Sequence, residues 1–210
     1  MTSPAYHWAT AHPPDSYAYI TPRVLRIVER LHVNRICDVG SGNGALVAAL
    51  HEAGYYVAGV DPDEAGVALS REHCAGVNFY ALSVEDDASP VLRGEGSVFD
   101  AVVSTEVVEH LYSPHLLPIL ARKLLPAGGY FVVATPYHGY LKNLALAVLN
   151  KWDAHLDPLW HNGHIKFWSR KTLTELLEGN GFEVIEFHGA GAGHRPKWLW
   201  TWMILVARAV

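Results

Sequence analysis

The sequence predicts an α/β protein built around a doubly wound, mostly parallel β-sheet, and three observations support this fold class. Short apolar runs alternate with segments of helical periodicity along most of the 210 residues. The first apolar run, with Ile36, Cys37 and Val39, leads directly into a turn that contains three glycines. The connections between elements are short, and short right-handed crossovers produce a doubly wound sheet.

The predicted elements begin with a helix over Tyr17–Leu31, after an irregular N-terminal stretch. Five strands are predicted where apolar residues run together, at Arg35–Val39, Tyr56–Asp61, Val77–Leu82, Phe99–Ser104 and Tyr130–Ala134. The Phe99–Ser104 run alternates too little for an edge strand, so we expect it in the middle of the sheet. Helices are predicted between the strands, at Ala45–Ala53, Asp63–His73 and Pro114–Leu124.

The C-terminal region predicts one more helix and a hairpin. Ser169 is the expected N-cap of a helix through Leu177, which glycines 179 and 181 end. The runs Phe182–Phe187 and Leu199–Ala207 flank a Gly/Pro turn region and read as a terminal hairpin. We therefore divide the chain into an N-terminal segment with a cap helix (1–34) and a main domain (35–210). Within the main domain, the aromatic-rich residues 135–168 form an insertion that we expect to cover the substrate.

The composition agrees with a compact enzyme. Half of the residues are hydrophobic and 18% are charged, which predicts one domain with a full core. The net charge of −5 argues against a surface that binds duplex nucleic acid. The only cysteines are Cys37, in a predicted strand, and Cys74, at the end of a predicted helix, which argues against a disulfide framework. The chain starts without the basic and apolar regions of a signal peptide, and its longest apolar run is too short for a bilayer. These features predict a cytoplasmic location.

The glycine turn and the acid that follows it predict a site for a nucleoside. Gly40, Gly42 and Gly44 allow a tight turn and let a ligand lie against bare backbone. The helix that follows presents free N–H groups to an acidic part of a ligand. Asp61 closes the second strand, where a carboxylate can hold both hydroxyls of a ribose.

Asp38, two residues before the first glycine, distinguishes between the nucleotides that such a turn binds. Gly40, Gly42 and Ala45 also satisfy the dinucleotide pattern G-x-G-x-x-G/A, so the glycines alone do not exclude NAD. A dinucleotide would bring a charged pyrophosphate to this turn, and the Asp38 carboxylate would oppose it. S-adenosylmethionine has no phosphate and carries an ammonium and a sulfonium, which an acid here would attract.

The run Asp38-Val39-Gly40-Ser41-Gly42-Asn43-Gly44 resembles the first motif of class I S-adenosylmethionine-dependent methyltransferases, an acid followed by G-x-G-x-G. The resemblance covers residues 17–208 and implies a Rossmann-like sheet of seven strands whose last strand is antiparallel. At the end of the third strand, Ser83 stands where the family often has an Asp, which puts that side-chain contact in doubt. The resemblance implies S-adenosyl-L-methionine as cofactor, bound by Asp38, Gly40, Gly42, Gly44, Asp61, Pro62, Ser83, Val84 and Thr105.

A second constellation follows the fourth strand. We expect a helix to begin near Thr105, and Glu106, Glu109 and His110 would then share one face of it at i, i+3 and i+4. This run, with the later His164, resembles two related groups: the O-methyltransferases of ubiquinone biosynthesis, which is the closer in motif, and the methyltransferases of RNA 3′ ends. The resemblance implies a divalent metal, Mg²⁺, Mn²⁺ or Zn²⁺, held by Glu106, Glu109, His110 and His164.

A metal-free interpretation stays open beside the metal site. Acids near a helix N-terminus also favour its dipole, and His110 would then be either a hydrogen-bonded residue behind the site or a general base. His138, after the fifth strand, is a competing base. The sequence thus leaves His110, Glu109 and His138 as the catalytic candidates.

Residues 139–168 are expected to decide the acceptor. They carry an apolar helical face followed by tryptophans and leucines: Tyr140, Leu141, Leu144, Ala145, Val148, Leu149, Trp152, Leu156, Leu159 and Trp160. Such a flap suits an aromatic or lipid-like small molecule, while core packing, a dimer contact and peripheral membrane contact remain open.

The predicted function is transfer of a methyl group from S-adenosylmethionine to oxygen on a small hydrophobic or phenolic acceptor. The alternatives are metal-dependent 2′-O-methylation at RNA 3′ ends, an NAD-dependent oxidoreductase and a non-catalytic cofactor-binding module. The lack of a basic run argues against nucleic acid as the partner.

Overall fold

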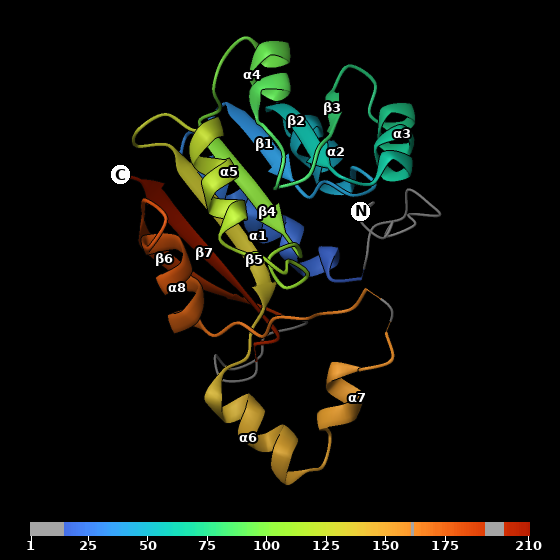
Figure 1. Cartoon of the computed structure of the whole chain (residues 1–210), viewed down its shortest axis with the longest axis vertical. Coiled ribbons are helices and arrows are strands. Elements are labelled where there is room, and N and C mark those ends of the chain that lie inside the picture. Colours follow the sequence, from blue (N-terminus) through green and yellow to red (C-terminus); the bar gives the residue numbers. More distant parts are fainter. Residues whose placement is uncertain (1–14, 161, 192–199) are drawn as a thin grey trace.

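The computed structural model describes residues 15–160, 162–191 and 200–210 and contains one seven-stranded sheet in the order β3-β2-β1-β4-β5-β7-β6 (Figure 1). The first five strands are parallel, and β7 runs antiparallel to both β5 and β6. This confirms the predicted fold class, with β4 in the middle of the sheet. The strands are β1 Arg35–Val39, β2 Tyr56–Asp61, β3 Asn78–Ala81, β4 Ala101–Thr105, β5 Tyr130–Pro136, β6 Phe182–Ala190 and β7 Trp202–Ala209.

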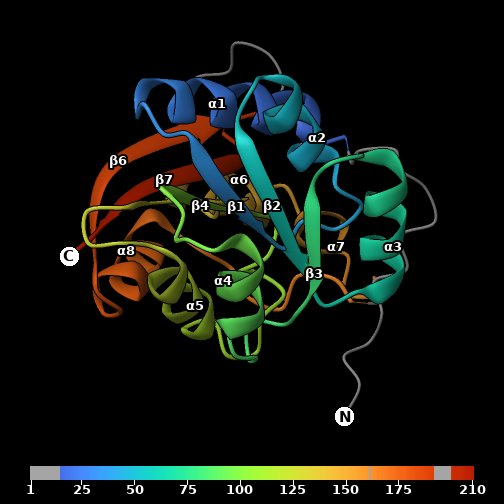
Figure 2. The same ribbon diagram turned by 90° about the horizontal axis from the view of Figure 1, so that it is seen from above.

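Helices cover both faces of the sheet and explain why the central strands are apolar on both sides (Figure 2). α1 (Tyr17–Arg30), α2 (Ala45–Glu52) and α3 (Glu64–His73) pack on one face. α4 (Ser89–Glu95), α5 (Leu116–Leu124) and α8 (Arg170–Glu178) pack on the other. Each face has its own core, so α1 is bound to the sheet through the same apolar cluster as α2.

The predicted elements are confirmed with shifted ends in several places. Ser169 is the N-cap of α8, as predicted. It also forms a capping box with Thr172. The fourth strand starts at Ala101 rather than Phe99, and β6 continues to Ala190. The start of the last predicted run, Leu199, lies outside the described residues, and β7 begins at Trp202. α4 is a helix that we did not predict.

Two short helices, α6 (Tyr140–Val148) and α7 (Trp152–Leu156), project away from the sheet after β5 (Figure 1). Neither contains a buried residue. The base of this projection is closed, because the His138 N–H donates to the Trp168 carbonyl at 2.9 Å and Tyr137 forms a bridge with Trp168. We call residues 139–160 the acceptor hairpin, after the role predicted for them from the sequence. Among the described residues, no helix is both long and apolar enough to cross a membrane.

Candidate functional site

The glycine turn is held against the end of β2 by its own backbone. The N–H groups of Gly40 and Ser41 both donate to the Val60 carbonyl, at 2.7 and 3.1 Å. Gly40 has φ +85°, and a Cβ there would come within 2.1 Å of the Val107 side chain. Glycine is therefore required at position 40 both for the left-handed conformation and for the close approach of Val107.

Asp61 organises this turn from the end of β2. Its carboxylate accepts hydrogen bonds from the N–H groups of Gly42, at 2.8 Å, and Asp63, at 2.9 Å. Burial raises its pKa despite these two bonds. A carboxylate has about four acceptor positions, so Asp61 keeps capacity for the hydroxyls of a ribose.

Asp38 is completely buried, and neither of its oxygens has a hydrogen-bond partner among the described residues. Burial, and then the neighbouring Asp61, raises its pKa to about 8. A buried carboxylate without a partner is costly, so this position is suited to a ligand that brings a positive charge.

The other predicted cofactor positions lie at the ends of the neighbouring strands. Thr105 ends β4 and is buried, whereas Pro62, after β2, is exposed. Ser83 forms a local turn after β3, with its N–H donating to Asp86 at 2.7 Å and its hydroxyl accepting from Glu85 at 3.3 Å. Val84 packs against the core.

The predicted helix at Thr105 is wrong. Residues 106–113 form turns, and Glu106 adopts φ +59°, which directs the chain away from a helical path. Glu106 consequently does not share a face with Glu109 and His110. Its carboxylate accepts a hydrogen bond of 2.8 Å from the Ser16 hydroxyl, and burial raises its pKa to about 7.

Three of the four predicted metal ligands converge. One ligand atom each from Glu109, His110 and His164 lies within 4.8 Å of the others, and Glu106 is not part of this cluster. The Thr135 hydroxyl on β5 donates to one Glu109 oxygen at 2.9 Å, and the other oxygen is buried without a partner in the described chain. Glu109 is thereby oriented by one oxygen while the other stays available to a ligand.

Backbone contacts hold the two histidines in place. His110 Nδ1 lies 3.0 Å from the Asn162 carbonyl and 3.2 Å from that of Gly163, so it serves as the donor and leaves Nε2 as an acceptor. The N–H groups of Ile165 and Lys166 donate to the Glu109 carbonyl, at 2.9 and 3.0 Å. These bonds tie the segment after α7 to the turn after β4.

The electrostatics of this cluster suit a cation. Burial raises the pKa of Glu109 to about 8, and burial lowers that of His164 to about 4. Burial also lowers the pKa of His110. Two imidazoles that are neutral near pH 7 and a buried carboxylate, each with one ligand atom in the cluster, form a donor set that divalent metals bind.

A second group of basic side chains lies at the base of the acceptor hairpin. The His138 ring is 5.9 Å from that of His155 and 5.1 Å from that of Phe167. Burial lowers the pKa of His138 to about 4, with further contributions from Lys142 and His155. Lys142 Nζ lies 3.4 Å from His155 Nε2. His138, the competing base, is thus neutral near pH 7, and its lowered pKa makes it a weak base.

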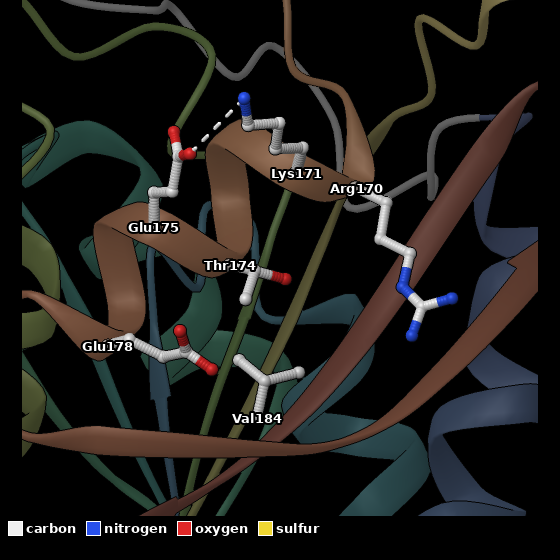
Figure 3. Close-up of a pocket in the computed structure, with 6 residues that line it drawn as sticks. All are labelled: Arg170, Lys171, Thr174, Glu175, Glu178 and Val184. Carbon is white, nitrogen blue, oxygen red and sulfur yellow. Dashed lines mark ion pairs between the residues drawn. The ribbon is translucent and has the colours of Figure 1, made fainter.

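A groove between α8 and β6 is separate from this site (Figure 3). It is lined by Val184 and by polar side chains of α8, including the ion pair between Lys171 and Glu175 at 3.7 Å, and by none of the predicted site residues.

Sequence reasoning missed the residues that reach the site from distant elements. Ser16 and Tyr17 contact the end of β4, and Thr135 orients Glu109 from the adjacent strand. Only Thr135 gave a local signal, as a polar residue near the end of an apolar strand.

A family model described as a methyltransferase domain matches residues 14–187, which is most of the chain. This match confirms the resemblance that the glycine-turn motif predicted.

Curated relatives of similar sequence are ubiquinone biosynthesis O-methyltransferases. The Rhizobium etli protein is 31% identical over 177 residues, which cover 80% of this chain and 66% of that protein. The mitochondrial Rattus norvegicus protein is 28% identical over 177 residues, with 80% of this chain and 50% of that protein covered. The chain thus spans about half the length of the rat relative and 62% of the Roseobacter denitrificans protein.

Solved methyltransferase structures share the fold. A putative methyltransferase of Bacillus halodurans has a TM-score of 0.68 at 15% identity, covering 90% of this chain and 98% of that one. The Synechocystis magnesium protoporphyrin IX methyltransferase with bound SAH has a TM-score of 0.65 at 19% identity, covering 90% and 82%. Fold, glycine turn and family match therefore agree, and the chain belongs to the methyltransferase domain family.

Proposed function

We propose that this protein transfers a methyl group from S-adenosylmethionine to a hydroxyl oxygen of a small aromatic or hydrophobic acceptor. The observation that carries this proposal is the Asp38 carboxylate, buried and unpartnered at the start of the glycine turn. S-adenosylmethionine would place its positively charged ammonium and sulfonium near this acid, whereas the pyrophosphate of NAD would add negative charge beside it.

The residues at the ends of β1 and β2 fit the cofactor. Asp61 is oriented by the Gly42 and Asp63 N–H groups and keeps acceptor capacity for the ribose hydroxyls. The bare backbone at Gly40 and Gly42 gives the ligand room to lie against the chain. Asp38 would face the positively charged end.

Transfer to oxygen is supported by the curated relatives, each named as an O-methyltransferase of ubiquinone biosynthesis. The reaction is an in-line displacement, so the protein must align donor and acceptor and remove the hydroxyl proton. His138, buried and neutral near pH 7, is one acceptor for that proton, and His110 is the other.

A divalent metal fits the cluster of Glu109, His110 and His164. Metal–ligand bonds of about 2.0–2.2 Å place neighbouring ligand atoms about 3–4 Å apart, so the cluster needs only a small contraction. The unpartnered Glu109 oxygen and one ring nitrogen from each of the two histidines are the atoms that would bind. When bound, the metal would lower the pKa of the acceptor hydroxyl. Thr135 and the Asn162 and Gly163 carbonyls then orient the ligands.

The acceptor hairpin supports a small apolar acceptor. Its exposed tryptophan and leucine side chains, including Trp160 at 44% and Leu144 at 47% exposure, offer apolar area that the folded chain leaves uncovered. The free, buried thiols of Cys37 and Cys74 agree with the predicted cytoplasmic location.

The other functions considered have less support. The net charge of −5 opposes an RNA end as acceptor, and the relatives described above are named for a small-molecule pathway. A non-catalytic binding module would have no use for the converging Glu109, His110 and His164.

Titration calorimetry with S-adenosylhomocysteine and NAD tests the cofactor, and we expect binding of the first only. Incubation with S-adenosylmethionine and 4-methylcatechol, followed by mass spectrometry, tests transfer to oxygen. Preferential NAD binding would refute the proposal. A methylated lysine or amine product with no methylated catechol would refute transfer to oxygen.

A further inference from the structure

The first turn of α1 reaches the end of β4 through two side chains. The Tyr17 hydroxyl lies 3.3 Å from the Thr105 hydroxyl, and the Ser16 hydroxyl donates to Glu106. Thr105 is buried at the carboxyl end of β4, beside the strand that carries Asp38. The start of α1 thereby brings a phenol to the place where the proposed cofactor would lie.

Acidic groups surround this phenol. Burial and the nearby carboxylates of Asp38, Glu106 and Asp61 raise the pKa of Tyr17 far above its usual range. Tyr17 therefore keeps its proton at neutral pH and can act as a hydrogen-bond donor.

The pair of Tyr17 and Thr105 hydroxyls has one O–H group available to donate to a ligand. The contact between the Tyr17 and Thr105 hydroxyls uses one of their two O–H groups, whichever residue donates. The remaining O–H can point to a ligand oxygen. It is a neutral donor among acids, so it offers a place for a ligand carboxylate that Asp38, Asp61 and Glu106 would otherwise repel.

We propose that the Tyr17 hydroxyl binds the α-carboxylate of the homocysteine part of S-adenosylmethionine, while Asp38 attracts the adjacent ammonium. This inference rests on the proposed function and adds a residue to its cofactor site. It also gives α1 a role in ligand binding beyond covering one face of the sheet.

The test compares two ligands in two variants. S-adenosylhomocysteine carries the carboxylate, and decarboxylated S-adenosylhomocysteine lacks that group alone. In the unmodified protein we expect calorimetry to give about ten-fold tighter binding of the first, as for a hydrogen bond to a charged group. Tyr17→Phe should abolish this preference. Tyr19→Phe is the matched control, because Tyr19 lies on the same helix but packs near Trp202, with 6.5 Å between ring centroids.

The outcomes separate this proposal from the proposed function. A preference that persists in Tyr17→Phe overturns the role of Tyr17 and leaves the cofactor assignment intact. An equal loss of affinity for both ligands in Tyr17→Phe also overturns the role of Tyr17, because it indicates a structural effect of the substitution. If Tyr17→Phe does not fold, Thr105→Val is measured instead and should lower the preference. No binding of S-adenosylhomocysteine to the unmodified protein overturns both proposals.

Discussion

The proposed cofactor side and the proposed acceptor side of this protein are built in opposite ways. At the ends of β1 and β2, Asp38 is completely buried, and Asp61 is held by two backbone N–H groups. In the acceptor hairpin no helical residue is buried, and Leu159 is 93% exposed. The cofactor side is thus fixed by the same packing that stabilises the fold. The acceptor side contributes little to folding, which leaves its side chains free to serve a ligand.

The largest effect is expected at the cofactor side. Gly40→Ala must force a left-handed alanine and displace Val107, so we expect a loss of about 2–5 kcal/mol in the free energy of unfolding. Gly54→Ala is the control, since φ there is +93° and nothing lies within 4 Å of the added Cβ. It should lose only about 1–2 kcal/mol in urea titrations. Equal losses would show that Val107 does not constrain the turn.

The proposed metal ligands Glu109, His110 and His164 should affect turnover without affecting cofactor binding. We expect His164→Ala, or dialysis against a chelator, to lower activity about 10- to 100-fold. S-adenosylhomocysteine affinity should change less than about two-fold, which is the smallest change expected from the loss of one hydrogen bond. His51→Ala, on α2, is the control. Full activity in excess chelator would exclude the metal and leave His110 or His138 as the base.

Asp38→Asn should separate stability from binding. The pKa of Asp38 is about 8 in the folded protein, well above the ordinary value of 3.8 for an aspartate, so the folded state binds an extra proton between these pH values. Its contribution to stability therefore falls as pH rises through this window, by up to about 1.4 kcal/mol per pH unit. We expect Asp38→Asn to reduce this slope and to be more stable at pH 7, yet to bind S-adenosylmethionine about ten-fold more weakly. An unchanged slope would mean that Asp38 is ionised in the folded protein.

The smallest effect is expected in the acceptor hairpin. Leu144→Gln should change the free energy of unfolding by less than about 0.5 kcal/mol, because the side chain is exposed. Leu46→Ala, in the core of α2, should lose about 2–5 kcal/mol. The same hairpin should gain protection from hydrogen exchange when an acceptor binds. A large destabilisation by Leu144→Gln would indicate that the hairpin packs against another surface in solution.

The sequence was sufficient for the parts of the molecule that local patterns determine. β1 and β2 have the predicted bounds because continuous apolar runs between polar residues allow few other interpretations. The helix predicted at Thr105 failed because the left-handed conformation of Glu106 has no signature in a non-glycine residue. α4 was missed because Pro90, Gly94 and Gly96 gave its segment the composition of a loop.

The candidate site, like the fold, was predicted only in the parts that local sequence features determine. Glu109 and His110 were identified from type and spacing and His164 through the family resemblance, and the structure brings the three together. Glu106 was assigned to them only through the helix that does not form. The contacts of Ser16, Tyr17 and Thr135 depend on which elements become neighbours, and that information lies in the packing of the whole sheet.

The closed base of the acceptor hairpin has a consequence for how such a protein can diversify. His138 and Trp168 are joined where the hairpin leaves and rejoins the domain, and Glu109 fixes the returning segment at Ile165. Insertions or replacements within residues 139–160 would therefore be isolated from the strands that carry the cofactor contacts. Under the proposed function, exchange of this segment in evolution or by engineering would alter the range of acceptors and leave the donor chemistry unchanged.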